Sequence, residues 1–254
     1  SFNAKISGKE SDYEKSSMLQ MELANIYSNK DDYKKLKAFS KCEDVKKDKD
    51  MNRQLKLMSN LYAGYQLDKN KLDEIIKLQT QIENKFSAFR ATVNNKQLTD
   101  NQIENTLKNS LDSKELEAAW LASKEIGPMV AGDVKKLVLM RNKAAKELGF
   151  KNYHQMMLKL NEQDPKEIEA LFNELDKLTR PAYTKLKNEI DAALAKKLGI
   201  KKNELRPWHY QNRYFQEAPQ IYDIDLDPYY KDANIEKLTK NYFNSIGMNI
   251  DNLI

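Results

Sequence analysis

The chain has 254 residues, which is long enough for one large or two ordinary domains with a sizeable core. Its 43 basic and 38 acidic residues are interleaved and leave a net charge of +5, which excludes the clustered basic face of a nucleic-acid-binding protein. Few glycines and prolines, 32% charged residues and a mean hydropathy of −0.80 predict an all-α protein built from long amphipathic helices.

A single cysteine, Cys42, excludes an internal disulfide and a metal site built from several cysteines. No apolar run approaches the roughly 18 residues that a membrane helix needs, so we predict no membrane segment. The single cysteine does not indicate a cellular compartment, because exported proteins of some organisms also lack disulfides.

Apolar residues in the first third of the chain recur at spacings near 3.6 residues, which predicts helices with one buried face. The predicted helices cover residues 11–27, Tyr33–Phe39, Leu55–Tyr65 and Leu72–Phe86. We expect the last two to be antiparallel neighbours, because only a short loop separates them. The periodicity then lapses, and residues 89–98 predict a small hairpin that turns at Asn94-Asn95.

Helix boundaries are marked more clearly in the second half. Thr99 with Gln102, and Asp112 with Glu115, have the spacing of capping boxes at helix N-termini. Glycine followed by an apolar residue predicts helix ends at Gly149 and Gly199. Further helices are predicted for residues 164–198 and 234–246. We therefore predict a single helical lobe over residues 1–254, partly elongated and antiparallel, with at most one short β-hairpin.

The stretch Leu205–Pro219, with the sequence LRPWHYQNRYFQEAP, concentrates aromatic residues and arginine. One hypothesis is that its rings are core aromatics of an irregular helix, with local partners for their polar tips. The other is that the stretch forms a functional site. Beyond it, Asp223, Asp225 and Asp227 alternate in a segment typical of a surface loop, because the glycine and terminal glutamate of a calcium loop are missing.

The residues by themselves carry no recognisable catalytic or metal-binding motif. A zinc peptidase of the His-Glu-x-x-His type needs two histidines one helical turn apart. The only histidines are His154 and His209, and neither has a nearby histidine or cysteine partner, so we interpret both as structural. Glycine-rich phosphate loops and nucleophile elbows are also absent from the sequence.

Four runs of residues occur in the same order and at similar spacing in a known protein family. They are AWLASKEIGP from Ala119, LMRNKAAKELGFKNY from Leu139, LFNEL from Leu171 and RPWHYQNRYFQEAP from Arg206. On these runs the chain resembles the N-terminal half of a bacterial member of the angiotensin-converting-enzyme family of zinc dipeptidyl carboxypeptidases. The similarity runs from about Phe2 to Ile254.

The resemblance implies a nearly all-helical protein with a deep channel between two lobes. In that family the His-Glu-x-x-His helix and a further glutamate ligand lie in the C-terminal half. Zinc would then be a cofactor of the parent enzyme, with its ligands outside this chain. The partners implied are short peptides and the C-terminal catalytic half of the same protein, with these 254 residues forming one wall of the channel.

The resemblance also implies individual site residues. The family places a glutamine against the C-terminal carboxylate of the substrate, on a helix that matches residues 208–217. Gln216 or Glu217 matches this position, and Phe215 adjoins it, so these three are the predicted substrate-binding residues. A glutamate there would repel a carboxylate. Animal members hold chloride with an arginine shortly after the tryptophan that matches Trp120, where this chain has Lys124, and with an aromatic that matches about Phe215.

We therefore predict the non-zinc-binding portion of a peptidase that removes C-terminal dipeptides or cleaves short peptides, inactive by itself. Within the aromatic stretch, Gln216 and Glu217 are expected to face the channel while Trp208 and Tyr210 anchor the segment in the core. The alternative is a non-enzymatic helical module that binds a protein or peptide in an aromatic groove. Single-stranded nucleic acid is a weaker third hypothesis, because the charge is mixed everywhere else.

Overall fold

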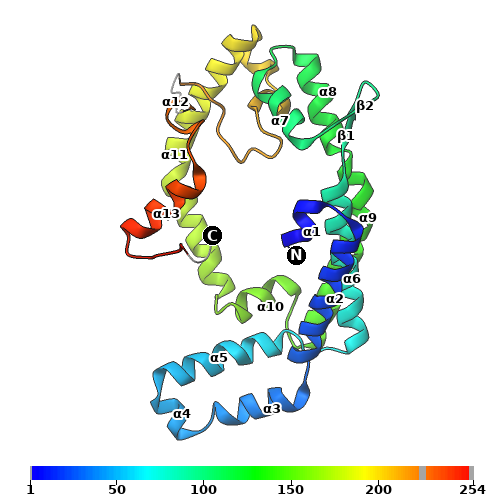
Figure 1. Cartoon of the computed structure of the whole chain (residues 1–254), viewed down its shortest axis with the longest axis vertical. Coiled ribbons are helices and arrows are strands. Elements are labelled where there is room, and N and C mark those ends of the chain that lie inside the picture. Colours follow the sequence, from blue (N-terminus) through cyan, green and yellow to red (C-terminus); the bar gives the residue numbers. More distant parts are fainter. Residues whose placement is uncertain (1, 223–226, 252–254) are drawn as a thin grey trace. The chain divides into compact units, whose positions relative to one another are not determined.

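The computed structural model describes residues 2–222 and 227–251 (Figure 1). The protein is all-α, as predicted, and within the described residues a two-stranded hairpin forms the one sheet. Contacts divide the chain into two compact units, residues 1–217 and 218–254, and each is described by itself. A single lobe over residues 1–254 stays a prediction.

The first unit begins with six helices that lead to the hairpin. They are α1 (Phe2–Ser7), α2 (Glu10–Tyr27), α3 (Lys30–Phe39), α4 (Glu43–Lys47), α5 (Lys49–Ala63) and α6 (Lys69–Ala88). Helix α3 starts three residues earlier than predicted. Its N-cap is Asn29, whose side chain accepts hydrogen bonds from the backbone N–H groups of Asp31 and Asp32.

Five helices and two short 3-10 turns follow the hairpin in the described part of the first unit. They are α7 (Asp100–Asn109), α8 (Ser113–Lys124), α9 (Ile126–Glu147), α10 (Tyr153–Leu160), α11 (Pro165–Leu198), η1 (Lys202–Glu204) and η2 (Pro207–Tyr210). The predicted glycine stops are confirmed. Gly149 and Gly199 have φ of 87° and 66°. The backbone N–H of the residue after each glycine donates to the carbonyl of Ala145 and of Ala195, respectively.

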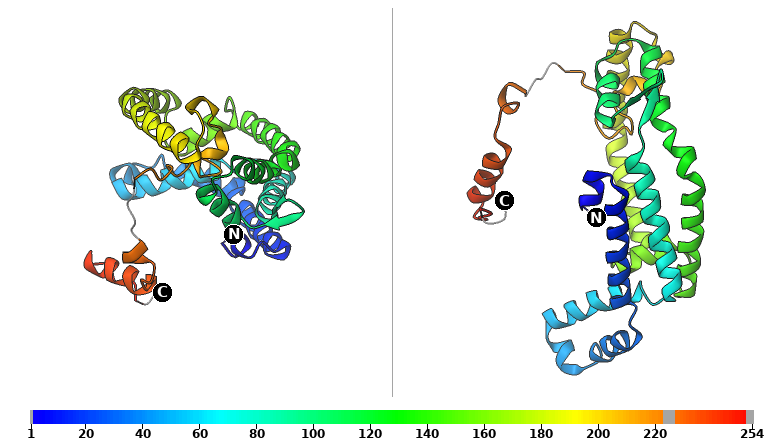
Figure 2. Two further views of the ribbon diagram at one scale, coloured as in Figure 1. Left: turned by 90° about the horizontal axis from the view of Figure 1, so that it is seen from above. Right: turned by 45° about the vertical axis from the view of Figure 1, so that its right-hand side comes forward.

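Helices α2, α6 and α9 run side by side (Figure 2). They share a core cluster that contains Ala24, Leu72 and Ala144. The predicted pairing of the helices around Leu55–Tyr65 and Leu72–Phe86 is wrong, because α5 packs against α3, α4 and α10 while α6 packs against α2 and α9. Gln66 explains the change of direction, since its side chain bonds the carbonyls of Tyr27 and Tyr62 and holds the turn between α5 and α6 against the end of α2.

The predicted hairpin is confirmed. Strands β1 (Ala91–Val93) and β2 (Lys96–Leu98) pair antiparallel, with Ala91 opposite Leu98. Asn94 and Asn95 both have positive φ, of 50° and 62°, as a two-residue type I′ turn requires. The hairpin brings the buried Ala91 into the core cluster formed by α7 and α8.

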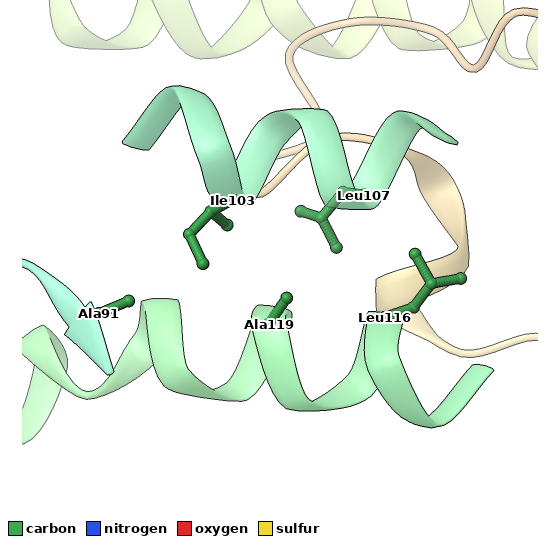
Figure 3. Packing of buried hydrophobic residues seen from close by; sticks show 5 residues of the cluster. All are labelled: Ala91, Ile103, Leu107, Leu116 and Ala119. Carbon is green, nitrogen blue, oxygen red and sulfur yellow. The ribbon is translucent and has the colours of Figure 1, made fainter. Parts of the chain in front are cut away.

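That core cluster positions the aromatic stretch. Ile103 and Leu107 of α7 point toward Leu116 and Ala119 of α8 (Figure 3), and all four are almost fully buried. Trp120 and Trp208 pack against the same cluster. The η2 turn is thus attached to α8 by apolar packing, although the two are far apart in the sequence.

The two predicted capping boxes have different outcomes. Thr99 and Gln102 form both reciprocal hydrogen bonds, so the first is confirmed. Asp112 does cap α8 by accepting the Lys114 N–H. However, the Glu115 carboxylate accepts a hydrogen bond from the Ser110 hydroxyl, and the Asp112 N–H donates to that same hydroxyl, so the second box is not formed.

The second unit contains α12 (Asp227–Tyr230) and α13 (Ile235–Ser245). The predicted last helix is confirmed: Asn234 caps it by accepting the Lys237 N–H, and Gly247 follows it with φ of 80°. Asp223 and Asp225 of the alternating carboxylates lie outside the described residues. Across residues 2–222 and 227–251, we find no helix with the length and apolar character needed to cross a bilayer.

Candidate functional site

His209 lies buried in the η2 turn and contacts two segments of the chain. Pro207 begins the turn and Gln211, with φ of 62°, ends it. The His209 Nδ1 accepts the Arg206 N–H at 2.9 Å, so in the neutral ring the proton is on Nε2, which lies 2.8 Å from the Ser113 Oγ. Burial lowers the pKa of His209, and the charge of Arg206 lowers it further, against an opposing effect of Glu117. His209 is therefore a neutral link between η2 and α8.

Two tryptophans and a lysine form the centre of the candidate site. The rings of Trp120 and Trp208 are tilted, with centroids 6.2 Å apart. The Lys124 Nζ lies 4.7 Å from the Trp120 ring and 4.3 Å from the Tyr214 ring, and it donates to the Arg213 carbonyl at 2.5 Å. Both indole Nε1 atoms are buried, and neither has a hydrogen-bond partner in the described part of the chain. The cluster therefore offers one partly enclosed cation and two unpaired donors.

Arg213 supplies a second cation close to Lys124. Its Nε donates to Glu104 at 2.7 Å and its Nη1 to Asp100 at 2.8 Å, so α7 holds the guanidinium in place. Burial by itself would lower the pKa of Arg213, but the two carboxylates outweigh burial and raise it. For Lys124, burial lowers the pKa, the charge of Arg213 lowers it further, and Glu104 opposes both. The site thus holds two cations beside two carboxylates, of which Glu104 is shielded and Asp100 is mostly exposed.

Residues 211–217 form a loop rather than the continued helix that the resemblance implied for residues 208–217. Gln211 and Phe215 have positive φ, of 62° and 56°, which an α-helix cannot contain. The Asn212 side chain accepts the N–H groups of Tyr214 and Gln216 and so replaces helical hydrogen bonds. The expectation of a helix there is wrong for this physical reason.

The loop exposes all three predicted substrate-binding residues. Phe215 packs edge-on against Tyr210, with ring centroids 6.3 Å apart. The side chain of Gln216 is exposed. Glu217 forms a 2.9 Å ion pair with Lys108 of α7, and this hydrogen bond raises the pKa of Lys108. A channel-facing role for Gln216 and Glu217 stays a prediction, whereas the anchoring of Trp208 in the core is confirmed.

The model of one protein family, described as angiotensin-converting enzyme and peptidase M2, matches residues 3–210. The chain belongs to this family. No curated protein and no solved structure gave a match.

Family membership makes this chain part of the peptidase class. Trp120, Lys124 and Trp208 lie inside the matched residues, whereas Phe215, Gln216 and Glu217 lie beyond the last matched residue. The substrate-binding assignment therefore rests on the likeness of the segment from Arg206 to Pro219 alone.

Peptidases of the angiotensin-converting-enzyme family depend generally on zinc, and the described residues do not fit a zinc site. Among residues 2–222 and 227–251, no three histidine, cysteine, aspartate or glutamate side chains are grouped to hold a metal. Both ring nitrogens of His209 are already engaged, and His154 is exposed on α10. No step of a reaction is therefore assigned to zinc on these residues.

Sequence reasoning missed the polar contacts that hold the aromatic stretch. The Tyr210 hydroxyl donates to Asp191 of α11 at 2.8 Å and accepts from Lys187 at 2.8 Å. Asp191 and Lys187 are four residues apart on a helix, and that spacing was the one signal for the pair. The pairing of Arg213 with Glu104 joins segments 109 residues apart, and no local pattern indicates it.

Proposed function

We propose that this chain is the N-terminal portion of a zinc-dependent peptidase that removes C-terminal dipeptides from short peptides. The observation that carries the proposal is the family match over residues 3–210. The His-Glu-x-x-His motif does not occur in the 254 residues. On this proposal, a C-terminal half supplies the zinc ligands, and the present residues form one wall of the substrate channel.

Helix α11 supports the existence of a missing partner. Every residue from Leu171 to Leu186 is exposed, and the main contacts of α11 within the first unit are with α10 and η1, which flank it. Leu171, Leu175 and Leu178 repeat along one face of this exposed stretch. A helix with little tertiary packing is marginal in water, and an uncovered apolar face usually marks an interface. We assign this face to the C-terminal catalytic half.

The loop after η2 is proposed to meet the substrate. The exposed amide of Gln216 is a donor suited to a peptide carboxylate. Glu217 would repel that carboxylate by itself, but its ion pair with Lys108 offsets part of its charge. We place Phe215 beside the substrate as an apolar contact, because more than half of its surface is exposed.

The same proposal assigns an anion to Lys124 and Trp120. The ammonium of Lys124 is partly desolvated, and the buried Trp120 Nε1 has no partner. An anion bound there would accept hydrogen bonds that the protein itself leaves unmade. Chloride is the anion that the family resemblance implies.

The proposal is tested by comparing this chain with a protein extended along its native reading frame. We expect the extension to contain His-Glu-x-x-His, and the extended protein to release a dipeptide from an N-blocked tripeptide with a free C-terminus. The chain by itself should release none. Gln216→Ala should raise KM for the peptide with a free C-terminal carboxylate. The control is the same peptide as its C-terminal amide, for which Gln216→Ala should leave KM unchanged.

A native stop codon directly after Ile254, or an extended protein without zinc-dependent hydrolysis, would contradict the proposal. Tight peptide binding by the isolated chain, abolished by Trp208→Ala, would instead favour the non-enzymatic binding module.

A further inference from the structure

Helices α2, α5, α6, α9 and α10 meet in the first unit (Figure 1). The side chains of these helices line a cleft of about 520 Å³. This volume falls within the range of ordinary small-molecule sites. Its walls are mostly aliphatic, with Leu61, Leu72, Ile76 and Met156 among the lining residues. The cleft is separate from the aromatic stretch, because none of its lining residues comes from beyond Asn161.

Among the described residues that line the cleft, Arg141 of α9 is the one that carries a charge. Its Nη2 donates to Gln79 at 2.7 Å, and its guanidinium lies 4.9 Å from the centroid of the Tyr153 ring. Its Nε is buried and has no hydrogen-bond partner among the residues that the structure describes. A guanidinium carries five donors, so most of the hydrogen-bonding capacity of Arg141 is unused by its neighbours.

Within the described ranges 2–222 and 227–251, Arg141 has no direct ionic partner. It contacts Gln79 and Tyr153, and its link to a carboxylate is indirect, because Gln79 in turn donates to Glu83. Arg141 is partly exposed overall, but its Nε is fully buried beside the aliphatic walls of the cleft. A cation in an apolar setting costs free energy unless an anion pairs with it.

We infer that this cleft binds an amphipathic carboxylate, whose apolar body lies along the aliphatic walls while its carboxylate pairs with Arg141. The planar guanidinium matches a carboxylate in a two-point geometry. Such a ligand could be a fatty acid or a peptide that ends in an apolar residue, and both present the same chemistry. The inference does not depend on the proposed peptidase activity.

The test is isothermal titration calorimetry on the 254-residue chain with decanoate and with N-acetyl-Phe-Leu, each beside its neutral counterpart, decanamide and the peptide amide. We expect at least one of the two carboxylates to bind. Its amide should bind about 10-fold more weakly, because one charge-assisted hydrogen bond contributes about a factor of ten in affinity. Decanoate as the tighter ligand would indicate a fatty acid, and the peptide as the tighter ligand a peptide C-terminus.

Arg141→Met keeps roughly the length of the side chain and removes its charge. It should weaken the binding of the carboxylate about 10-fold and leave the affinity for the amide unchanged. The matched control is Lys143→Met, which removes one charge from an exposed position of the same helix that does not line the cleft. Leu61→Trp replaces a partly exposed lining residue with a larger one. It should fill the cleft and so prevent the binding of both the carboxylate and the amide.

Equal weakening by Arg141→Met and Lys143→Met would show a nonspecific charge effect and overturn the inference. The inference would also be overturned if neither carboxylate bound to a chain that far-ultraviolet circular dichroism shows to be folded. The outcome is distinct from failure of the peptidase proposal, because the cleft and the aromatic stretch share no lining residue.

Discussion

Arg213 and Glu104 form an ion pair with 2.7 Å between Nε and Oε1, and the pair fastens the loop after η2 to α7. The two side chains are largely shielded, at 15% and 24% exposure. Asp100 pairs with the same guanidinium but is 61% exposed. Arg213 thus has one shielded and one solvated partner, and the two carboxylates should differ in their contribution to stability.

We predict that Glu104→Gln lowers the free energy of unfolding by about 1–3 kcal/mol, because the guanidinium then loses the shielded one of its two ionic partners. Asp100→Asn is the matched control and should cost less than about 1 kcal/mol, since exposed ion pairs contribute little. Urea unfolding followed by circular dichroism measures both. Equal losses would show that burial does not distinguish the two pairs.

His209 predicts a pH dependence of stability. Its folded-state pKa is lowered below the ordinary value of 6.5, chiefly by burial and then by Arg206. The unfolded chain therefore binds more protons than the folded chain as pH falls below 6.5, and stability should drop there and be fully present above it. Urea unfolding across this range measures the slope.

The slope attributed to His209 should be absent in His209→Gln, although that variant is less stable at neutral pH because it loses the links to Arg206 and Ser113. His154→Gln on the exposed face of α10 is the control and should keep the slope. A slope that survives in His209→Gln would assign the pH dependence to carboxylates instead.

The apolar face of α11 predicts a measurable property of the isolated chain. Leu171, Leu175 and Leu178 are exposed in the first unit, so the chain should bind the dye ANS. Replacing all three by serine should reduce the fluorescence clearly and change the free energy of unfolding by less than about 1 kcal/mol, because exposed positions contribute little to stability. A triple substitution that unfolds the chain would show that this face is packed.

Lys124 predicts the anion response of the extended peptidase. Lys124→Met should abolish any rise of kcat/KM with chloride, whereas Lys124→Arg should keep it, because both cations can pair with an anion. At saturating chloride, kcat/KM of Lys124→Met should be about 10-fold lower than that of the wild type, because one hydrogen bond to a charged group contributes about this factor. Lys114→Met, at the opposite end of α8, is the control. Identical chloride curves for wild type and Lys124→Met would remove the anion assignment.

The sequence by itself determined features that depend on neighbouring residues. Asn94-Asn95 specified the hairpin turn because asparagine tolerates positive φ, and Gly149 and Gly199 ended helices because glycine adopts the left-handed conformation without strain. Helical periodicity indicated the all-α class for the same local reason. The four runs shared with the angiotensin-converting-enzyme family indicated the family that the match over residues 3–210 shows.

Only the tertiary structure decided which helices meet and which polar groups pair. The α5–α6 pairing was mispredicted because loop length does not encode the hydrogen bonds by which Gln66 turns the chain. The loop at Phe215 depends on Asn212 competing with the helix for backbone donors. No pattern in the sequence indicated a binding role for Arg141, because the cleft beside its guanidinium is formed by aliphatic side chains from four other helices.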